Sequence, residues 1–112
     1  MRVPRFSRST LAAAAIIAAV ASVPADPGGR RHVVIRIRGL RYSPDTLMVS
    51  VGDTITWQND DVVPHTVTAS RRSWDSGLLS TGDRYTLVVT DSTPDRYRCR
   101  FHPEMVATLR RK

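Results

Sequence analysis

The sequence predicts an all-β fold, a two-sheet antiparallel sandwich of about seven to eight short strands with Greek-key connections. Three observations support this prediction. Short runs rich in Val, Thr, Ile and Tyr alternate between apolar and polar residues, and clusters of Gly, Pro, Asn and Asp separate them. No stretch beyond Arg31 keeps the apolar period of a helix.

The first three predicted strands are residues 32–38, 46–51 and 54–57. In the first, apolar residues at every second position alternate with arginines, which predicts one buried and one exposed face. The second and third repeat the alternation on either side of Gly52-Asp53, a turn signal that joins the two strands.

Four more strands are predicted in the second half of the chain, at residues 65–69, 84–89, 95–100 and 106–110. Each is short and rich in residues that favour strands, and turn residues bound it. The least regular segment, Ser70 to Gly82, is expected to form a surface excursion between strands that Trp74 anchors.

The first 25 residues have the pattern of a secretory signal peptide. Three arginines precede an unbroken apolar run from Leu11 to Ala21, which is shorter than the roughly 20 residues of a membrane-spanning helix. We expect cleavage after Ala21 or Ala25 and export to the periplasm or another extracytoplasmic compartment, with no stable membrane insertion afterwards; an uncleaved anchor is the alternative. The predicted divisions are a signal peptide at 1–25, a short flexible segment at 26–31 and one domain at 32–112.

The charge of the mature chain is modest. The full sequence has 17 basic and 10 acidic residues, and three of the arginines lie in the predicted leader, which leaves 14 basic residues and a net charge of +4. The basic residues are scattered among acidic ones, and no nucleic-acid motif accompanies them. Nucleic acid is therefore not an expected partner.

The single cysteine, Cys99, excludes an internal disulfide. In the predicted strand 95–100, Tyr97 and Cys99 share one side and arginines take the other, so the thiol is expected to point inward. A leftover cysteine in an exported protein is an intermolecular bridge, a reactive thiol or a metal ligand. An inward thiol at a strand end favours the protected ligand.

Cys99 opens a C-x₂-H-x₂-M run that places His102 and Met105 within seven residues, and Pro64-His65 lies upstream. Two imidazoles, a thiolate and a weak axial thioether form a donor set that suits copper and electron transfer. Zinc would not select a thioether, and haem attachment would need a second cysteine. Each residue alone also has a plain structural explanation. Nucleophilic Cys/His catalysis stays formally possible, but nothing in the sequence supplies an orienting third residue or a substrate cleft.

These residues carry a resemblance to the cupredoxins, the plastocyanin, pseudoazurin and amicyanin group of small blue copper proteins. The resemblance runs nearly end to end, and the short spacing between His102 and Met105 is closest to the amicyanin loop. The segments that carry it are Tyr42-Ser43-Pro44, Val51-Gly52-Asp53-Thr54, Thr56-Trp57, Asn59, Pro64-His65-Thr66-Val67, Asp75-Ser76-Gly77, Tyr97 and the run from Cys99 to Met105.

The resemblance implies one copper ion per chain, with four ligands and two supporting residues. The ligands would be His65, Cys99, His102 and Met105. Asn59 would tie the two ligand-bearing loops together, and the Thr66 backbone N–H would donate toward the thiolate.

The resemblance also implies a function. It suggests a carrier of single electrons through Cu(I) and Cu(II), not an enzyme, with electrons entering at a surface formed by His102, Pro64 and Pro103. We expect a monomer whose partners are redox proteins such as a c-type cytochrome or a dehydrogenase. The alternative is a periplasmic copper chaperone or resistance protein.

Overall fold

The computed structural model describes residues 2–4 and 30–112. Nearly all of the predicted signal peptide, both candidate cleavage positions and most of the predicted flexible segment lie outside the described residues. Of that segment Arg30 and Arg31 are described, and the Arg31 backbone N–H donates to the Asp53 carboxylate at 2.9 Å. Within the described part of the chain, no helix is long and apolar enough to cross a membrane.

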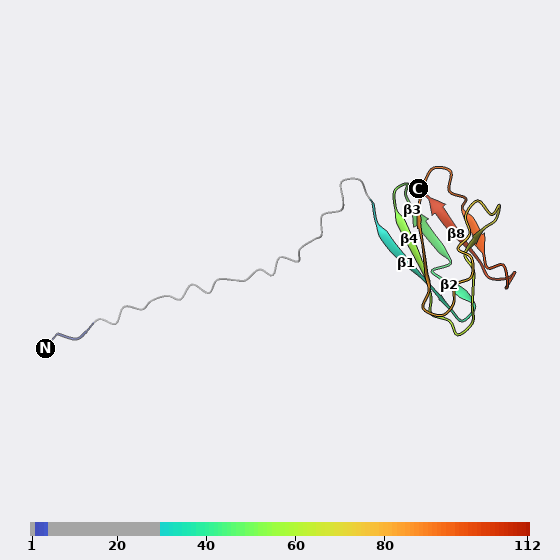
Figure 1. The fold of residues 1–112 in the computed structure, drawn as a ribbon. Helices are drawn as coiled ribbons and strands as arrows, with labels where there is room; N and C mark the ends of the chain where they lie inside the picture. The colour runs from blue at the N-terminus through green and yellow to red at the C-terminus, as the bar shows by residue number, and fades with distance from the viewer. Residues whose placement is uncertain (1, 5–29) are drawn as a thin grey trace.

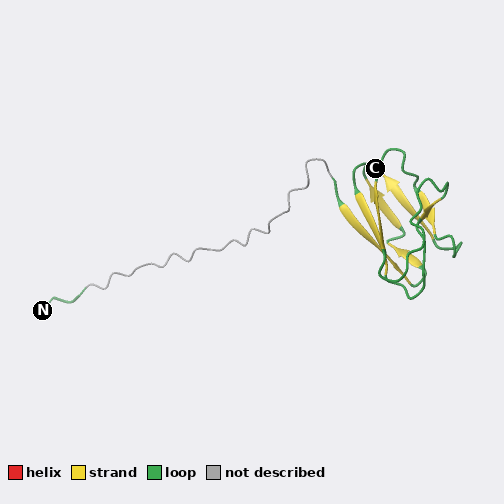
Figure 2. Ribbon diagram, viewed as in Figure 1, coloured by secondary structure: helices red, strands yellow, loops and turns green. Residues whose placement is uncertain are grey.

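The described residues form strands joined by turns and loops, with no helix among them (Figure 2). There are eight strands. Their bounds are β1 His32–Arg38, β2 Arg41–Ser43, β3 Thr46–Val49, β4 Thr54–Asn59, β5 Thr68–Ala69, β6 Arg84–Val88, β7 Arg96–Arg98 and β8 Val106–Arg111.

The strands make two four-stranded sheets that pack face to face, which confirms the predicted all-β sandwich. One sheet has the order β2-β1-β4-β6 and the other β3-β8-β7-β5. Figure 1 shows β1 beside β4 in the first sheet and β3 beside β8 in the second.

The predicted antiparallel pairing holds for four of the six strand pairs of the described residues and is wrong for the other two. β1 pairs with β4 in parallel, and so does β3 with β8, whereas the remaining pairs are antiparallel. The reason is the path of the chain, which crosses to the second sheet between β2 and β3 and returns between β3 and β4. Strands joined in this way are not hairpin partners, so Gly52-Asp53 turns the chain from one sheet to the other.

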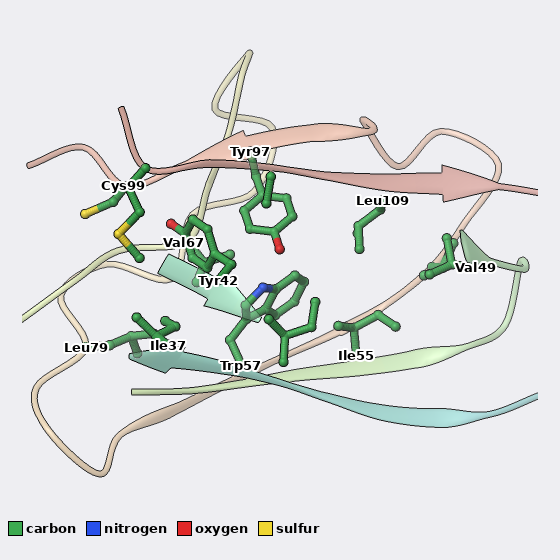
Figure 3. Packing of buried hydrophobic residues seen from close by; sticks show 14 residues of the cluster. Ile37, Tyr42, Val49, Ile55, Trp57, Val67, Leu79, Tyr97, Cys99 and Leu109 are labelled. Atoms are coloured by element: carbon green, nitrogen blue, oxygen red, sulfur yellow. The ribbon is translucent and has the colours of Figure 1, made fainter. Parts of the chain in front are cut away.

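The core lies between the sheets and is built from the inward residues of each strand. In β1, Ile35 and Ile37 are fully buried while Arg36 and Arg38 are exposed, as the alternation predicts. Figure 3 shows Cys99 at one end of this core and Val49 at the other, with Trp57 between them. The thiol therefore lies where the sandwich interior meets the loops at one end.

Aromatic residues fill the middle of the core. The ring of Tyr97 packs edge-on against two other rings. Its centroid lies 5.4 Å from that of Trp57 and 4.7 Å from that of Tyr42. Burial raises the pKa of both tyrosines, so they stay neutral phenols. Trp74 is half-buried, and its ring centroid lies 5.7 Å from that of Trp57. This contact confirms the predicted role of Trp74 as the anchor of the irregular segment Ser70 to Gly82.

Candidate metal centre

The segment between β4 and β5 presents His65. Its backbone N–H donates to the Leu79 carbonyl at 3.0 Å, and its carbonyl accepts from the Leu79 N–H at 2.8 Å. This isolated bridge replaces the predicted start of a strand at His65, because regular pairing in β5 begins only at Thr68. The side chain of His65 is fully buried.

The loop between β7 and β8 presents the other three predicted ligands. Cys99 directly follows β7, and Met105 directly precedes β8. The Met105 N–H donates to the His102 carbonyl at 2.8 Å, and the Cys99 N–H donates to the Met105 carbonyl at 3.1 Å. These two hydrogen bonds close the short loop, so the residues that follow Cys99 fold back over its side chain.

Three donor atoms meet at this end of the core. The Cys99 sulfur lies 3.8 Å from His65 Nδ1 and 3.6 Å from His102 Nδ1. The donor atoms of the three residues all lie within 4.8 Å of one another. Cys99 and His65 are fully buried and His102 is half-buried. Met105 is buried in the same core cluster as Cys99.

Thr66 connects the two loops that carry these residues. Its backbone N–H donates to the Cys99 sulfur at 3.4 Å, as the resemblance predicts, and its hydroxyl accepts from the Arg100 N–H at 2.9 Å. Hydrogen bonds to a ligand sulfur hold its geometry and tune a metal.

Asn59 does not join the two ligand loops as we expected. Its amide nitrogen donates to the carbonyls of Val63 and Leu79, at 3.0 and 2.9 Å, and its amide oxygen accepts from the Asp61 N–H at 2.9 Å. Asn59 therefore holds the His65 loop to the segment at Leu79, because its amide nitrogen and its amide oxygen are both engaged there. Thr66 makes the link between the loops.

Asp61 is a buried residue of this site that the sequence reasoning missed. Its carboxylate oxygen Oδ2 lies 2.8 Å from His65 Nε2. The backbone N–H of Leu40, followed by the His65 ring, lowers the pKa of Asp61 to about 2 despite burial. An acidic residue four positions before a candidate ligand histidine signals such a contact. Asp60 and Asp61 are adjacent, however, and the sequence does not show which of the two makes it.

One edge of the site reaches the surface at His102. Pro64 and Pro103, predicted to flank this edge, are exposed, and Phe101 and Val62 are exposed with them. A shallow cleft beside the histidine is lined by residues of the β1–β2 turn and of the ligand loop, among them Leu40, Phe101 and Pro103. Arg41 and Glu104 line the same cleft, so the surface around His102 combines exposed apolar residues with two charged side chains.

The donor chemistry fits copper better than other common metals. A thiolate with two imidazole nitrogens makes the trigonal set of blue copper sites, and a methionine beside them supplies the weak axial thioether. A structural zinc site usually takes four Cys or His ligands, and only three such residues meet here within the described part of the chain. The full burial of His65 and Cys99 would keep water away from that side of a bound ion.

No protein-family model matches the chain. The chain is 30% identical over 78 residues to amicyanin from Paracoccus denitrificans, a match that covers 65% of this chain and 60% of that protein. The chain thus spans less than two thirds of the length of this curated relative.

Solved structures give a similar result. A novel purple cupredoxin from Nitrosopumilus maritimus matches with a TM-score of 0.65 and 33% identity, over 71% of this chain and 99% of that one. A methionine-to-alanine variant of amicyanin in its Cu(I) form matches with a TM-score of 0.65 and 27% identity, over 72% of this chain and 82% of that one.

Proposed function

Because the chain belongs to the cupredoxins, we propose that it is a mononuclear blue copper protein that carries single electrons between redox partners. One observation carries this proposal. Two imidazole nitrogens and one cysteine sulfur lie within 4.8 Å of one another at the end of a sandwich core, and Met105 is buried in the same core cluster as Cys99.

In this proposal His65, Cys99, His102 and Met105 hold one copper ion, which supplies a one-electron couple when bound. The chain keeps the donors in place in either oxidation state. Thr66 restrains the sulfur, and the closed loop restrains His102 and Met105. Donors that are already assembled need little rearrangement when the charge of the site changes, and this favours fast transfer.

We propose the surface around His102, with its exposed apolar residues, as the place where electrons enter and leave. Its ring links the buried sulfur to the exterior, and the exposed Pro103 follows it in the chain. The exposed Pro64 precedes His65, whose ring centroid lies 5.0 Å from that of His102. Weak redox encounters bury little area, so a small apolar patch is sufficient for a partner such as a c-type cytochrome or a dehydrogenase. The proposed location of the mature protein is the periplasm or another extracytoplasmic compartment.

Copper addition tests the site. The purified mature chain is expected to bind one Cu(II) ion with intense blue absorption and narrow copper hyperfine splitting. Cys99→Ser should abolish both signals because it removes the thiolate. His32→Asn is the matched control, since His32 lies in β1 and its ring contacts Thr56. A colourless adduct of the unaltered chain would overturn the proposal.

The same sample separates a carrier from a copper chaperone or resistance protein. A carrier should take up and release one electron reversibly while it keeps its copper. A Cu(I) complex that resists reoxidation and hands its ion to another protein would favour the chaperone. The buried thiol of Cys99 supports the carrier, because chaperones exchange their metal through exposed ligands.

A further inference from the structure

The His65 ring has a carboxylate on the side opposite the candidate copper site. The Oδ2 atom of Asp61 lies 2.8 Å from Nε2 of the ring, and Nδ1 of the same ring faces the Cys99 sulfur at 3.8 Å. The His65 side chain is fully buried and that of Asp61 is 11% exposed. Water therefore competes little for this contact.

This contact selects which ring nitrogen carries the proton. An ionised carboxylate can only accept hydrogen bonds, so the short contact requires an N–H on Nε2. In a neutral imidazole the other nitrogen, Nδ1, then has a free lone pair. That lone pair faces the Cys99 sulfur, as a metal ligand on this side of the ring must do.

The carboxylate itself cannot turn away. Its Oδ2 atom also accepts from the Leu40 backbone N–H at 2.9 Å, and Oδ1 accepts from the Val62 N–H at 2.9 Å. The Asp61 backbone N–H is held by Asn59. Leu40 in the β1–β2 turn and Val62 in the same loop thus hold the Asp61 carboxylate, and Asn59 at the end of β4 holds the Asp61 backbone. Such charge-assisted hydrogen bonds are stronger than neutral ones.

The neighbouring Asp60 lacks this environment. Its carboxylate lies 3.0 Å from the Arg36 guanidinium and 3.7 Å from that of Arg38. Two arginines therefore compensate its charge on the outer side of the sheet. Asp61 contacts backbone amides and the His65 ring instead, so its negative charge acts on the site.

We propose that Asp61 is a positioning residue of the copper site, which holds His65 with Nδ1 free toward Cys99 and whose charge favours Cu(II) over Cu(I). This inference deepens the proposed function and rests on it, since it concerns copper held at those ligands. Partners of ligand histidines outside the donor set typically change metal affinity 10–100-fold.

The experiment compares Asp61→Asn with Asp60→Asn. The first keeps the size of the side chain but removes the charge, and it brings an amide N–H₂ against either the Val62 N–H or the His65 ring. The second removes a carboxylate one residue away that does not face the ring. Two readouts are taken, the His65 ring nitrogens by ¹⁵N NMR in the metal-free protein and the reduction potential in the copper form.

In the unaltered protein we expect the proton of His65 on Nε2. Asp61→Asn should shift the tautomer toward a mixture. It should also lower the Cu(II) affinity about tenfold relative to the Cu(I) affinity, which is a rise of about 59 mV in a one-electron potential. Asp60→Asn should leave both readouts unchanged.

If a blue site forms and the two variants behave alike in both readouts, the inference is overturned while the proposed function stands. If the unaltered chain forms no copper site, the proposed function fails, and an unshifted tautomer in Asp61→Asn would then overturn the positioning role separately. Should Asp61→Asn fail to fold, the smaller Asp61→Ser takes its place with the same expected shifts.

Discussion

At the scale of single residues, Asn59 shows how much of the site depends on one buried amide. Both amide hydrogens and the amide oxygen are used, toward Val63, Leu79 and the Asp61 N–H. These bonds set the loop from which Asp61 and His65 project. Asn59 is not itself a proposed metal ligand, but its hydrogen bonds help to position the proposed ligand His65.

Asn59→Ala should lower the free energy of unfolding by about 3 kcal/mol, because it removes the Asn59 partner of the Val63 carbonyl and of the buried Asp61 N–H, and each such group costs about 1–3 kcal/mol. The Leu79 carbonyl keeps the His65 N–H as its other donor. Urea unfolding of the metal-free protein measures this. In the copper form the same variant should shift the reduction potential.

Gln58→Ala is the control for this variant. Gln58 is half-buried, and its amide contacts the Asp60 carboxylate. Its loss should cost no more than about 1 kcal/mol. Equal unfolding midpoints for the two variants, or an unchanged potential in Asn59→Ala, would contradict the role that we give to Asn59.

At the scale of elements, the turn between β3 and β4 is fastened to the beginning of β1. The Asp53 carboxylate is fully buried and accepts from the backbone N–H groups of Ser50 and Arg31, each at 2.9 Å, with the Arg31 guanidinium at 3.4 Å. Burial alone would raise the pKa of Asp53, but these hydrogen bonds outweigh it and lower the pKa.

A lowered pKa makes this turn sensitive to acid. The carboxylate contributes its full stability above the unfolded-state pKa of roughly 3.9, and the contribution is lost as pH falls through the lower folded-state pKa. Asp53→Asn should therefore cost about 2 kcal/mol of unfolding free energy at neutral pH, the usual value for hydrogen bonds to a charged group, and less as pH falls below 4.

Urea unfolding of the metal-free protein at several pH values between 7 and 3 checks this expectation. Asp91→Asn is the control, since Asp91 is exposed in another turn. A difference between Asp53→Asn and the unaltered chain that stays constant over the whole pH range would show that the charge of Asp53 is not what stabilises the turn.

At the scale of the whole molecule, the candidate site joins segments that are distant along the chain. His65 and Cys99 are separated by 34 positions, and their loops lie together because β5 pairs with β7 in the same sheet. A metal held by both residues would bind the folded state far better than the unfolded chain. Such an ion would add to the net stability of the folded domain.

Copper should therefore raise the melting temperature. Free ligand at 1,000 times Kd adds about 4.1 kcal/mol, and each kcal/mol shifts the melting temperature of a small domain by about 4–8 °C, so we expect a rise of more than about 15 °C. Calorimetry with copper and after chelation measures it. The rise should disappear in Cys99→Ser, and an equal rise in that variant would indicate adventitious binding elsewhere.

The alternation of residues predicted some elements better than others. The bounds of β1 match the prediction, because an alternating run with one buried face suffices to define such a strand. The strand predicted from His65 shrinks to Thr68–Ala69 because the N–H groups before it are used elsewhere. The Thr66 N–H donates to the Cys99 sulfur, and the Val67 N–H donates to the Ser76 hydroxyl.

The short strand β2 was not predicted at all. It has three residues, Arg41 to Ser43, of which only Tyr42 is buried. No periodicity can be recognised in so short a run, and β2 exists because Arg36, Ile37 and Arg38 offer it an edge for pairing.

The sequence by itself determined the class of fold, the inward direction of Cys99 and the order of the donor residues, because these depend on local alternation and on spacing within one loop. Only the tertiary structure decided the parallel pairing of the strands, the meeting of His65 with Cys99 and His102, and the choice of Asp61 over Asp60 as partner of the His65 ring. These features depend on contacts between residues that are remote in sequence and on the direction in which single side chains point, which a pattern of residue types does not encode.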